Sequence, residues 1–392
     1  MAATENPTIK NIYGKHYSVV DTDIFSMIPH FFHEFNNDPE VLVIYAGPSK
    51  QYFPGLDAVK TSMMRADIKR SVNEKTRLCF EDIHEGATGT SLLKIHEIIK
   101  DLIPANQVYY FTGALNADDS YSELCERFGI TEKIHINTCS SWEHHLKINS
   151  QIKRESYTIK TKEKNFLCFN RIRRSHRLAL LGMISNRNIL ENCFYSYMNA
   201  DYGKGATMSA ADIKSSINDP DVQAEIVNGL SKISIPLKLN IEPDDNINFV
   251  RADDGIYFDE SYLSIVTETF FYPVDNRWGD KIVQDFDAIF FSEKIFKPIL
   301  MQHPFMVVSV KGSLAFLRKL GYKTFSPFID ETYDDIEDNT TRLKYIADEI
   351  ERLNKKTSSE WIEWQNNIKT IVDHNYSILT NKKRPEFAVS RS

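Results

Sequence analysis

Three observations predict an α/β protein built on parallel β-sheets. Continuous apolar runs end in Gly or Pro, as in residues 41–48, which is typical of strands buried on both faces. Stretches with apolar residues at helical spacing lie between such runs, as in residues 91–102. The two patterns alternate along the chain, and this alternation favours repeated β-loop-α-β units.

The length of the chain predicts two domains, because 392 residues exceed the size at which a single core usually stops growing. Residues 1–150 are expected to form an N-terminal Rossmann-like domain. Residues 147–164 are polar and basic, which indicates a connection between domains. Residues 151–392 are expected to form a second Rossmann-like domain followed by terminal helices.

Each expected element rests on a local pattern. Strands are expected where apolar residues run into Gly, Pro or a polar loop, and helices where apolar residues recur every three or four positions. Thr357 and Glu360 have the spacing of a helix capping box. The expected strands are residues 41–48, 77–83, 107–113, 134–137, 165–170, 261–269, 305–308 and 322–325. The expected helices are residues 91–102, 120–128, 178–190, 313–320, 340–353 and 357–379, with one more beginning at Glu293.

The composition excludes several classes of protein. A hydrophobic content of 42% argues against disorder, and a formal net charge of −7 argues against a surface coated with basic residues for nucleic acid. The five cysteines are odd in number and have no CxxC spacing, so a disulfide framework is not expected and a reduced, cytoplasmic location is. No apolar run approaches the roughly 20 residues that cross a bilayer, so no membrane partner is expected.

A basic loop follows the strand expected at residues 165–170. The junction between a strand and a helix presents free backbone N–H groups, and guanidinium groups add bidentate phosphate donors. Arg177 is the strongest candidate, because apolar neighbours in the helix fix its backbone. A solvated basic loop, or arginines covering a domain interface, is the alternative. The candidate phosphate-binding residues are Asn170, Arg171, Arg173, Arg174, His176 and Arg177.

A second candidate group lies at the start of the helix that begins at Glu293. Its carboxylate could accept hydrogen bonds from ribose hydroxyls, while the Lys294 ammonium and the helix N-terminus both favour phosphate. Glu268 follows another expected strand, and Lys297 lies one turn after the Glu293–Lys294 pair. Ordinary helix-dipole chemistry with a solvated lysine is the alternative reading. Together these residues predict a site for a nucleoside diphosphate.

Five segments resemble a family of phage-encoded glycosyltransferases and, more distantly, the α-1,3-fucosyltransferases. The segments are residues 166–181, 262–271, 291–299, 303–308 and 317–325. The resemblance implies two Rossmann-like domains facing a cleft, the GT-B arrangement, with the acceptor on residues 1–150 and the nucleotide-sugar donor on residues 151–392. It also implies that Glu293 binds the donor ribose, Lys294 the pyrophosphate and Arg177 a phosphate.

An inverting transfer needs a base that deprotonates the acceptor hydroxyl. Glu85 is the candidate, because it lies in a loop at an expected strand end beside Gly86, with His84 and Asp82 as rivals. A loop carboxylate without a catalytic role is the alternative. Glu268 leaves a retaining outcome open.

No metal ligand set is expected. The adjacent His144 and His145 would point in different directions, and no third ligand is spaced with them. Asp334 and Asp335 are expected to be surface acids. The donor, a nucleoside diphosphate sugar, would therefore bind without a tightly held cofactor.

The function expected is that of a metal-independent glycosyltransferase acting on a hydroxyl group. A hydroxymethylated base in phage DNA is one acceptor, with residues 60–77 and 147–177 as basic segments that could follow phosphates. A glycan or a small molecule is the alternative acceptor. A non-catalytic nucleic-acid-binding protein on a transferase fold is the rival class, and a kinase is disfavoured because no glycine-rich phosphate loop is present.

Overall fold

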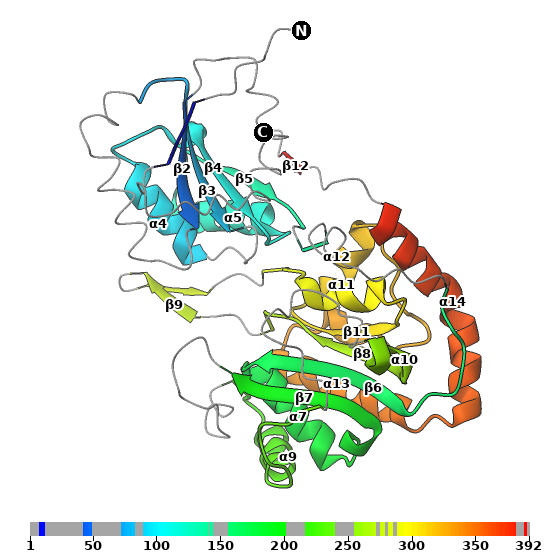
Figure 1. The fold of residues 1–392 in the computed structure, drawn as a ribbon. Coiled ribbons are helices and arrows are strands. Elements are labelled where there is room, and N and C mark those ends of the chain that lie inside the picture. The colour runs from blue at the N-terminus through cyan, green and yellow to red at the C-terminus, as the bar shows by residue number, and fades with distance from the viewer. Residues whose placement is uncertain are drawn as a thin grey trace, which may run out of the picture. The chain divides into compact units, whose positions relative to one another are not determined.

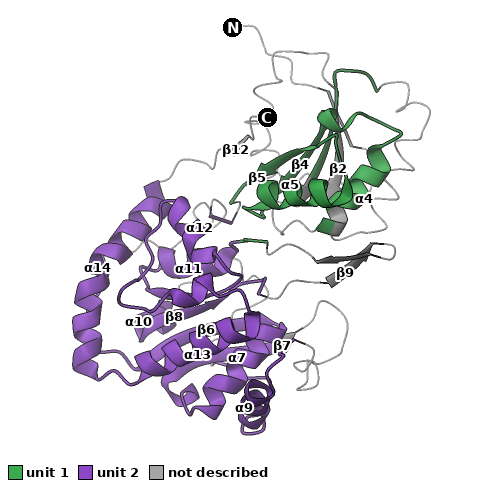
Figure 2. Ribbon diagram, turned by 180° about the vertical axis from the view of Figure 1, so that it is seen from behind, with its two compact units in different colours: residues 1–141, 273–290, 384–392 green, residues 142–272, 291–383 purple. Residues whose placement is uncertain are grey.

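The structure, a computed structural model, divides the chain into two compact units (Figure 2). Unit 1 comprises residues 1–141, 273–290 and 384–392, and unit 2 comprises residues 142–272 and 291–383. Residues 273–290 and 384–392, which the sequence places with the C-terminal part, therefore cluster with the N-terminal part. The structure describes residues 8–11, 42–48, 72–82, 89–140, 142–143, 156–200, 216–239, 255–271, 275–278, 281–284, 288–381 and 388–389.

Unit 1 is built on a sheet whose strands follow one another in chain order (Figure 1). The parallel strands are β1 (Thr8–Asn11), β2 (Leu42–Pro48), β3 (Thr76–Asp82), β4 (Val108–Thr112) and β5 (His135–Thr138), and β12 (Ala388–Val389) pairs antiparallel with β5. The remaining elements are helices α4 (Gly89–Ile99) and α5 (Ala117–Phe128), the 3₁₀ turn η2 (Ala105–Gln107) and an antiparallel hairpin of β9 (Asp275–Trp278) and β10 (Lys281–Gln284).

Unit 2 contains a four-stranded parallel sheet in the order β7-β6-β8-β11. Its strands are β6 (Lys164–Ile172), β7 (Cys193–Ala200), β8 (Ser261–Thr267) and β11 (Phe305–Val308). Its helices are α7 (Ser175–Asn186), α9 (Pro220–Leu230), α10 (Gly255–Asp259), α11 (Glu293–Leu300), α12 (Ser313–Lys319), α13 (Asn339–Asn354) and α14 (Ser358–Asn381), with 3₁₀ turns η3 (Leu190–Asn192) and η4 (Thr332–Asp335).

The strand order of unit 2 reverses between β6 and β8. From β6 the chain crosses through α7 to β7 on one side, whereas from β8 it crosses through α11 to β11 on the other. Right-handed crossovers then place α7 and α11 on opposite faces of the sheet. The carboxyl ends of β6 and β8 form a topological switch point, where open α/β sheets leave a crevice for ligands.

Helix α7 packs unusually closely on α9. A Cβ built on Gly182 would lie 2.6 Å from the Ile226 carbonyl oxygen, and one on Gly229 would lie 1.7 Å from the Gly182 carbonyl oxygen. The Ser185 hydroxyl crosses the same contact to donate to the Gly229 carbonyl at 2.9 Å. Glycine at both positions lets the two helix backbones touch, and this contact fixes the position of α7 relative to α9.

The C-terminal helices cover the rest of unit 2, and α14 runs along its outside (Figure 1). The expected capping box at its start is confirmed: the Thr357 N–H donates to Glu360 Oε2 at 2.7 Å, and the Glu360 N–H donates to Thr357 Oγ1 at 3.3 Å. Trp361 is 1% exposed and stacks on Tyr262 of β8, with ring centroids 4.7 Å apart. Helix α14 is thereby anchored on the sheet.

The predicted α/β class with parallel sheets is confirmed, whereas two expectations are wrong. Residues 322–325 do not form a strand, because the Asn375 side chain accepts from the Lys323 N–H and donates to the Lys323 carbonyl, both at 2.8 Å, in place of a strand ladder. Asp334 is not a surface acid: it is 4% exposed, and its carboxylate accepts from the first N–H groups of α12.

All five cysteines are buried and none is in a disulfide. Among the described residues, no helix is both long and apolar enough to cross a membrane.

Candidate functional site

The candidate site lies in unit 2 at the carboxyl ends of β6 and β8, beside the first turns of α7 and α11. The chain brings it together in a regular way: β6 leads into α7 through residues 173–174, and the loop before α11 ends at the N-cap residue Ser292. Both helix N-termini therefore carry their positive dipole ends to the edge of the sheet at the switch point.

A buried side-chain bridge extends the contact between β6 and β8 beyond their backbone pairing. The last paired residues of the two strands are Leu167 and Ser264. Three residues further on, the Thr267 hydroxyl donates to Asn170 Oδ1 at 2.5 Å, and each residue is 1% exposed. The strands therefore stop pairing through their backbones before the site, and Asn170 holds them together there.

Arg177 is buried, and its guanidinium links the ends of β6 and β8. Its Nη1 donates to the Ile172 carbonyl at 2.8 Å, and its Nη2 donates to the carbonyls of Thr267 and Glu268 at 3.0 and 3.1 Å. Its Nε is buried without a hydrogen-bond partner. Burial lowers the pKa of Arg177 to about 10, so the guanidinium stays charged at neutral pH.

His176, in the first turn of α7, also binds the end of β8. Its Nε2 lies 3.0 Å from the Glu268 carbonyl oxygen, which can only accept, so Nε2 carries the proton. The ring stacks on Phe271 with centroids 5.3 Å apart. Burial holds the pKa of His176 well below its usual value, with the nearby Arg177 charge adding to the effect. His176 is therefore neutral at neutral pH and orders the Glu268 backbone.

The carboxylate of Glu268 is completely buried and points to the start of α11. Its Oε2 accepts from the Ser292 hydroxyl at 2.6 Å, and its Oε1 accepts from the Ser292 backbone N–H at 3.2 Å. The Thr269 N–H also donates to Oε2, at 3.3 Å. Burial raises the pKa of Glu268, although the Lys294 charge and the Ser292 hydrogen bonds oppose that rise.

Lys294 is a partly exposed cation of this cluster. Its Nζ donates to Ser292 Oγ at 3.0 Å and to Glu293 Oε1 at 2.9 Å, and its side chain is 26% exposed. Burial alone would raise the pKa of Glu293, but the charges of Lys294 and Lys297 outweigh burial and lower it to about 2. Glu293 is therefore an ionised acceptor at any physiological pH.

The loop arginines differ from one another in their surroundings. Arg174 is the exposed N-cap residue of α7, and its side chain does not cap the helix. Its charge contributes to the lowered pKa of both His176 and Arg177, which places it near these two buried residues. Arg171 and Arg173 are half-buried. The N-terminal end of α7 thus carries one exposed guanidinium beside the positive end of the helix dipole.

This arrangement suits a phosphate-bearing ligand. The N-terminus of α7, the exposed Arg174 and the partly exposed Lys294 favour anionic oxygens, while the ionised Glu293 can accept from hydroxyl groups. Among the residues that the structure describes, no three His, Cys, Asp or Glu side chains are grouped to hold a metal ion.

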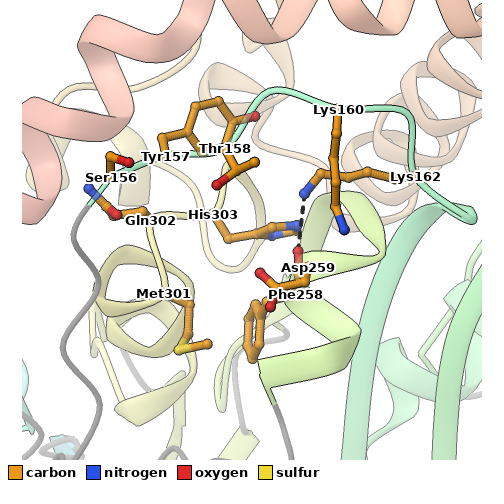
Figure 3. A pocket seen from close by; sticks show the side chains of 10 residues that line it. All are labelled: Ser156, Tyr157, Thr158, Lys160, Lys162, Phe258, Asp259, Met301, Gln302 and His303. Carbon is orange, nitrogen blue, oxygen red and sulfur yellow. Dashed lines mark hydrogen bonds between the residues drawn. The ribbon is translucent and has the colours of Figure 1, made fainter.

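A small polar pocket lies at the opposite, amino-terminal edge of the same sheet (Figure 3). Its cavity volume is about 20 Å³, and Lys160, Lys162 and His303 are among the residues that line it. Both cations are engaged: Lys160 pairs with Glu260 at 2.5 Å, and Lys162 donates to the Phe258 carbonyl at 3.1 Å. This pocket is too small for a nucleotide.

The structure brings together most of the residues predicted from the sequence. Asn170, His176, Arg177, Glu268, Glu293 and Lys294 are connected through hydrogen bonds that run by way of Thr267 and Ser292. Lys297 acts on Glu293 through its charge. Glu85, the predicted base, lies outside the described residues.

Two members of the cluster, Ser292 and Thr267, were not among the predicted site residues. Ser292 stands at the position directly before the helix, where serine is a preferred N-cap, and that preference is a usable signal. Thr267 had no comparable signal, because its role depends on how β8 lies beside β6.

Comparison with known proteins adds no family: no protein-family model, no curated protein and no solved structure matches the chain. The fold and the site therefore define a class only. The chain is an α/β protein with parallel sheets and a cationic, phosphate-compatible switch point in unit 2.

Proposed function

We propose that the chain is a metal-independent glycosyltransferase that uses a nucleoside diphosphate sugar and belongs to the GT-B type. One observation carries the proposal: Lys294 is held by Ser292 and Glu293 at the switch point of unit 2, beside the N-terminal end of α7. A helix end, an oriented ammonium and an ionised carboxylate together match a diphosphate joined to a ribose.

In this proposal Lys294 and Arg174 bind the diphosphate, and Glu293 accepts from the ribose hydroxyls. The bond between the anomeric carbon and the diphosphate oxygen breaks as the acceptor oxygen bonds to that carbon. Negative charge then grows on the leaving diphosphate, where fixed cations stabilise the transition state more than the ground state. Arg171 and Arg173 lie on the same loop and would add positive charge near the phosphates.

Arg177 contributes indirectly in this account. Three of its five N–H donors bind backbone carbonyls and the residue is 2% exposed, so a phosphate has little access to the guanidinium. It would instead keep the ends of β6 and β8 in place under the ligand, while its buried charge adds to the positive potential there.

The acceptor is proposed to be a hydroxyl group, with Glu85 taking its proton. A hydroxymethylated base in phage DNA is the leading candidate, on the resemblance of five segments to phage-encoded transferases. A duplex acceptor would have to be flipped out of the helix to react. A glycan or small molecule is the alternative acceptor.

The second candidate function is nucleic-acid binding without turnover. It is favoured by the run of arginines at 171–177, which could bind phosphates of a polynucleotide as well as those of a nucleotide. The two functions differ in a measurable way, because polynucleotide binding depends steeply on salt through counterion release.

A thermal-shift panel of nucleoside diphosphates and their sugars tests the proposal. A ligand that binds only the folded state at 100 times its Kd stabilises it by about 2.7 kcal/mol. We expect one nucleotide to raise the unfolding temperature of the wild type and of Lys344→Ala, an exposed control on α13, but not of Lys294→Ala. If no nucleotide shifts the wild type while DNA does, the transferase proposal is wrong and the binding function replaces it.

A further inference from the structure

Glu268 lies where a residue that binds the sugar donor is expected, but a bound ligand has no direct access to its carboxylate. It lies at the switch point, yet it is completely buried. Both carboxylate oxygens already accept hydrogen bonds, from Ser292 and Thr269. A bound nucleotide would have to displace these donors in order to reach the carboxylate.

The hydroxyl of Ser292 uses all of its hydrogen-bonding capacity. A serine hydroxyl has one proton and two lone pairs. Its proton goes to Glu268 Oε2 at 2.6 Å, and its oxygen accepts from Lys294 Nζ at 3.0 Å and from the Lys294 backbone N–H at 3.4 Å. Without the carboxylate the hydroxyl could rotate, and its lone pairs would no longer be directed towards Lys294.

The backbone of Glu268 supports the other helix. Its carbonyl oxygen accepts from His176 Nε2 at 3.0 Å and from Arg177 Nη2 at 3.1 Å. One residue therefore contacts the first turn of α7 through its main chain and the N-cap of α11 through its side chain. The two helix ends that the site uses are tied to the same point.

We propose that Glu268 is a positioning residue, which orients the Ser292 hydroxyl and through it holds the Lys294 ammonium in place for an anionic ligand. The identity of that ligand as a nucleoside diphosphate rests on the proposed function, whereas the coupling from Glu268 to Lys294 does not. Neither Glu268 nor Ser292 then needs to touch the ligand.

The coupling can be measured without any nucleotide, through the reactivity of Lys294. Acetylation of each lysine by acetic anhydride, followed by mass spectrometry, reports how firmly each amine is held. In Ser292→Ala we expect Lys294 to react about tenfold faster than in the wild type, because its amine loses one hydrogen-bond acceptor and helix α11 loses its N-cap hydroxyl. Glu268→Gln is expected to accelerate Lys294 less, since an amide oxygen can still accept from the hydroxyl.

The controls separate positioning from general loosening. Ser185→Ala removes a buried hydroxyl of the same unit, far along α7 from the site, and should leave the rate at Lys294 unchanged. Ser292→Thr retains the hydroxyl and should restore the wild-type rate. An unchanged acetylation rate at Lys294 in both Ser292→Ala and Glu268→Gln would overturn the proposal. If only one of the two variants folds, an unchanged rate in that variant would overturn it.

Nucleotide binding then distinguishes this inference from the proposed function. The affinity of wild type, Ser292→Ala, Lys294→Ala and the double variant forms a double-mutant cycle. If Ser292 acts through Lys294, the serine change should cost at least about fivefold in Kd when Lys294 is present and almost nothing when it is absent. Additive losses contradict the positioning role, whereas a wild type that binds no nucleotide contradicts only the proposed function.

Discussion

Asn170 and Thr267 join the ends of β6 and β8 through one buried hydrogen bond of 2.5 Å, at a level where the two strands no longer pair through their backbones. The bond lies directly under the candidate site. It joins the two strands at the point where the backbone ladder between them has ended.

Thr267→Val tests this bond with little change of shape. The substitution leaves Asn170 Oδ1 buried without its donor, which should cost about 1–3 kcal/mol of unfolding free energy. Chemical denaturation of the two proteins measures the difference. Thr341→Val, at an exposed threonine whose hydroxyl water can replace, should cost clearly less. Equal losses in the two variants would contradict a special role for the Asn170–Thr267 bond.

Arg174→Asp should separate stability from binding. Aspartate is a preferred N-cap and the Arg174 side chain does not cap α7, so the substitution should raise the unfolding free energy by about 0.5–1 kcal/mol. The same carboxylate would occupy the helix N–H groups and repel phosphate, so nucleotide binding should be lost.

Arg174→Ala is the matched control, since it should weaken binding without the gain in stability. Calorimetric titration and denaturation of both variants measure the two effects. Nucleotide binding that survives in Arg174→Asp would place the phosphate away from the end of α7.

The ionised state of Glu293 should make stability depend on pH. Its folded pKa of about 2 lies below its ordinary value of 4.5, so its contribution is fully present above pH 4.5 and is lost as pH falls from 4.5 through 2. The pKa difference corresponds to about 3 kcal/mol. The difference in unfolding free energy between wild type and Glu293→Gln should therefore shrink over this range.

The pH dependence of stability that Glu268 contributes has the opposite sign, and Glu268→Gln tests it. The pKa of Glu268 is raised by burial, so its contribution is present below its ordinary value and is lost as pH rises through the folded pKa. Relative to Glu268→Gln, the wild type should lose stability as pH rises. Parallel pH curves for wild type and both variants would contradict the assigned charge states.

Gly229→Ala should destabilise unit 2 severely, because its Cβ would lie 1.7 Å from a backbone carbonyl that cannot move without shifting α7. We expect a loss of at least about 3 kcal/mol in denaturant unfolding. Gly129→Ala in unit 1 has the strained φ of 67° but nothing within 4 Å, so it should cost about 1 kcal/mol. A smaller loss at Gly229 than at Gly129 would show that the two helices can separate easily.

Many elements were predictable from local patterns, because the apolar run ending at Asn170 and the helix that starts at Glu293 have clear spacing, but β7 and α9 were not among the expected elements. The strand expected at residues 322–325 is an instructive error. Tyr322 and Phe325 are apolar enough for a strand, but Asn375 of α14 takes the backbone groups between them, and no local rule foresees that partner.

Most members of the site were predictable from the sequence, but not Ser292, Thr267 or the contacts that each residue makes. Strand-end position and charge identified Arg177 and Glu268 from the sequence. That Arg177 binds the Thr267 carbonyl follows from the pairing of β6 with β8, which joins residues 90 positions apart, and the contact of Glu268 with Ser292 spans 24 positions. Such long-range pairings leave no trace in the spacing of one segment.

The burial of every cysteine gives the chain a built-in reporter of opening. Thiols react as thiolates, and burial raises the pKa of Cys79 to about 12 and of Cys168 to about 11, so a thiol reagent should modify them only in transiently opened molecules. Cys79, Cys125 and Cys139 belong to unit 1, while Cys168 and Cys193 belong to unit 2. Labelling followed by mass spectrometry can thus time the opening of each unit separately in the unmodified protein, and a nucleotide held in unit 2 would slow the labelling of Cys168 and Cys193.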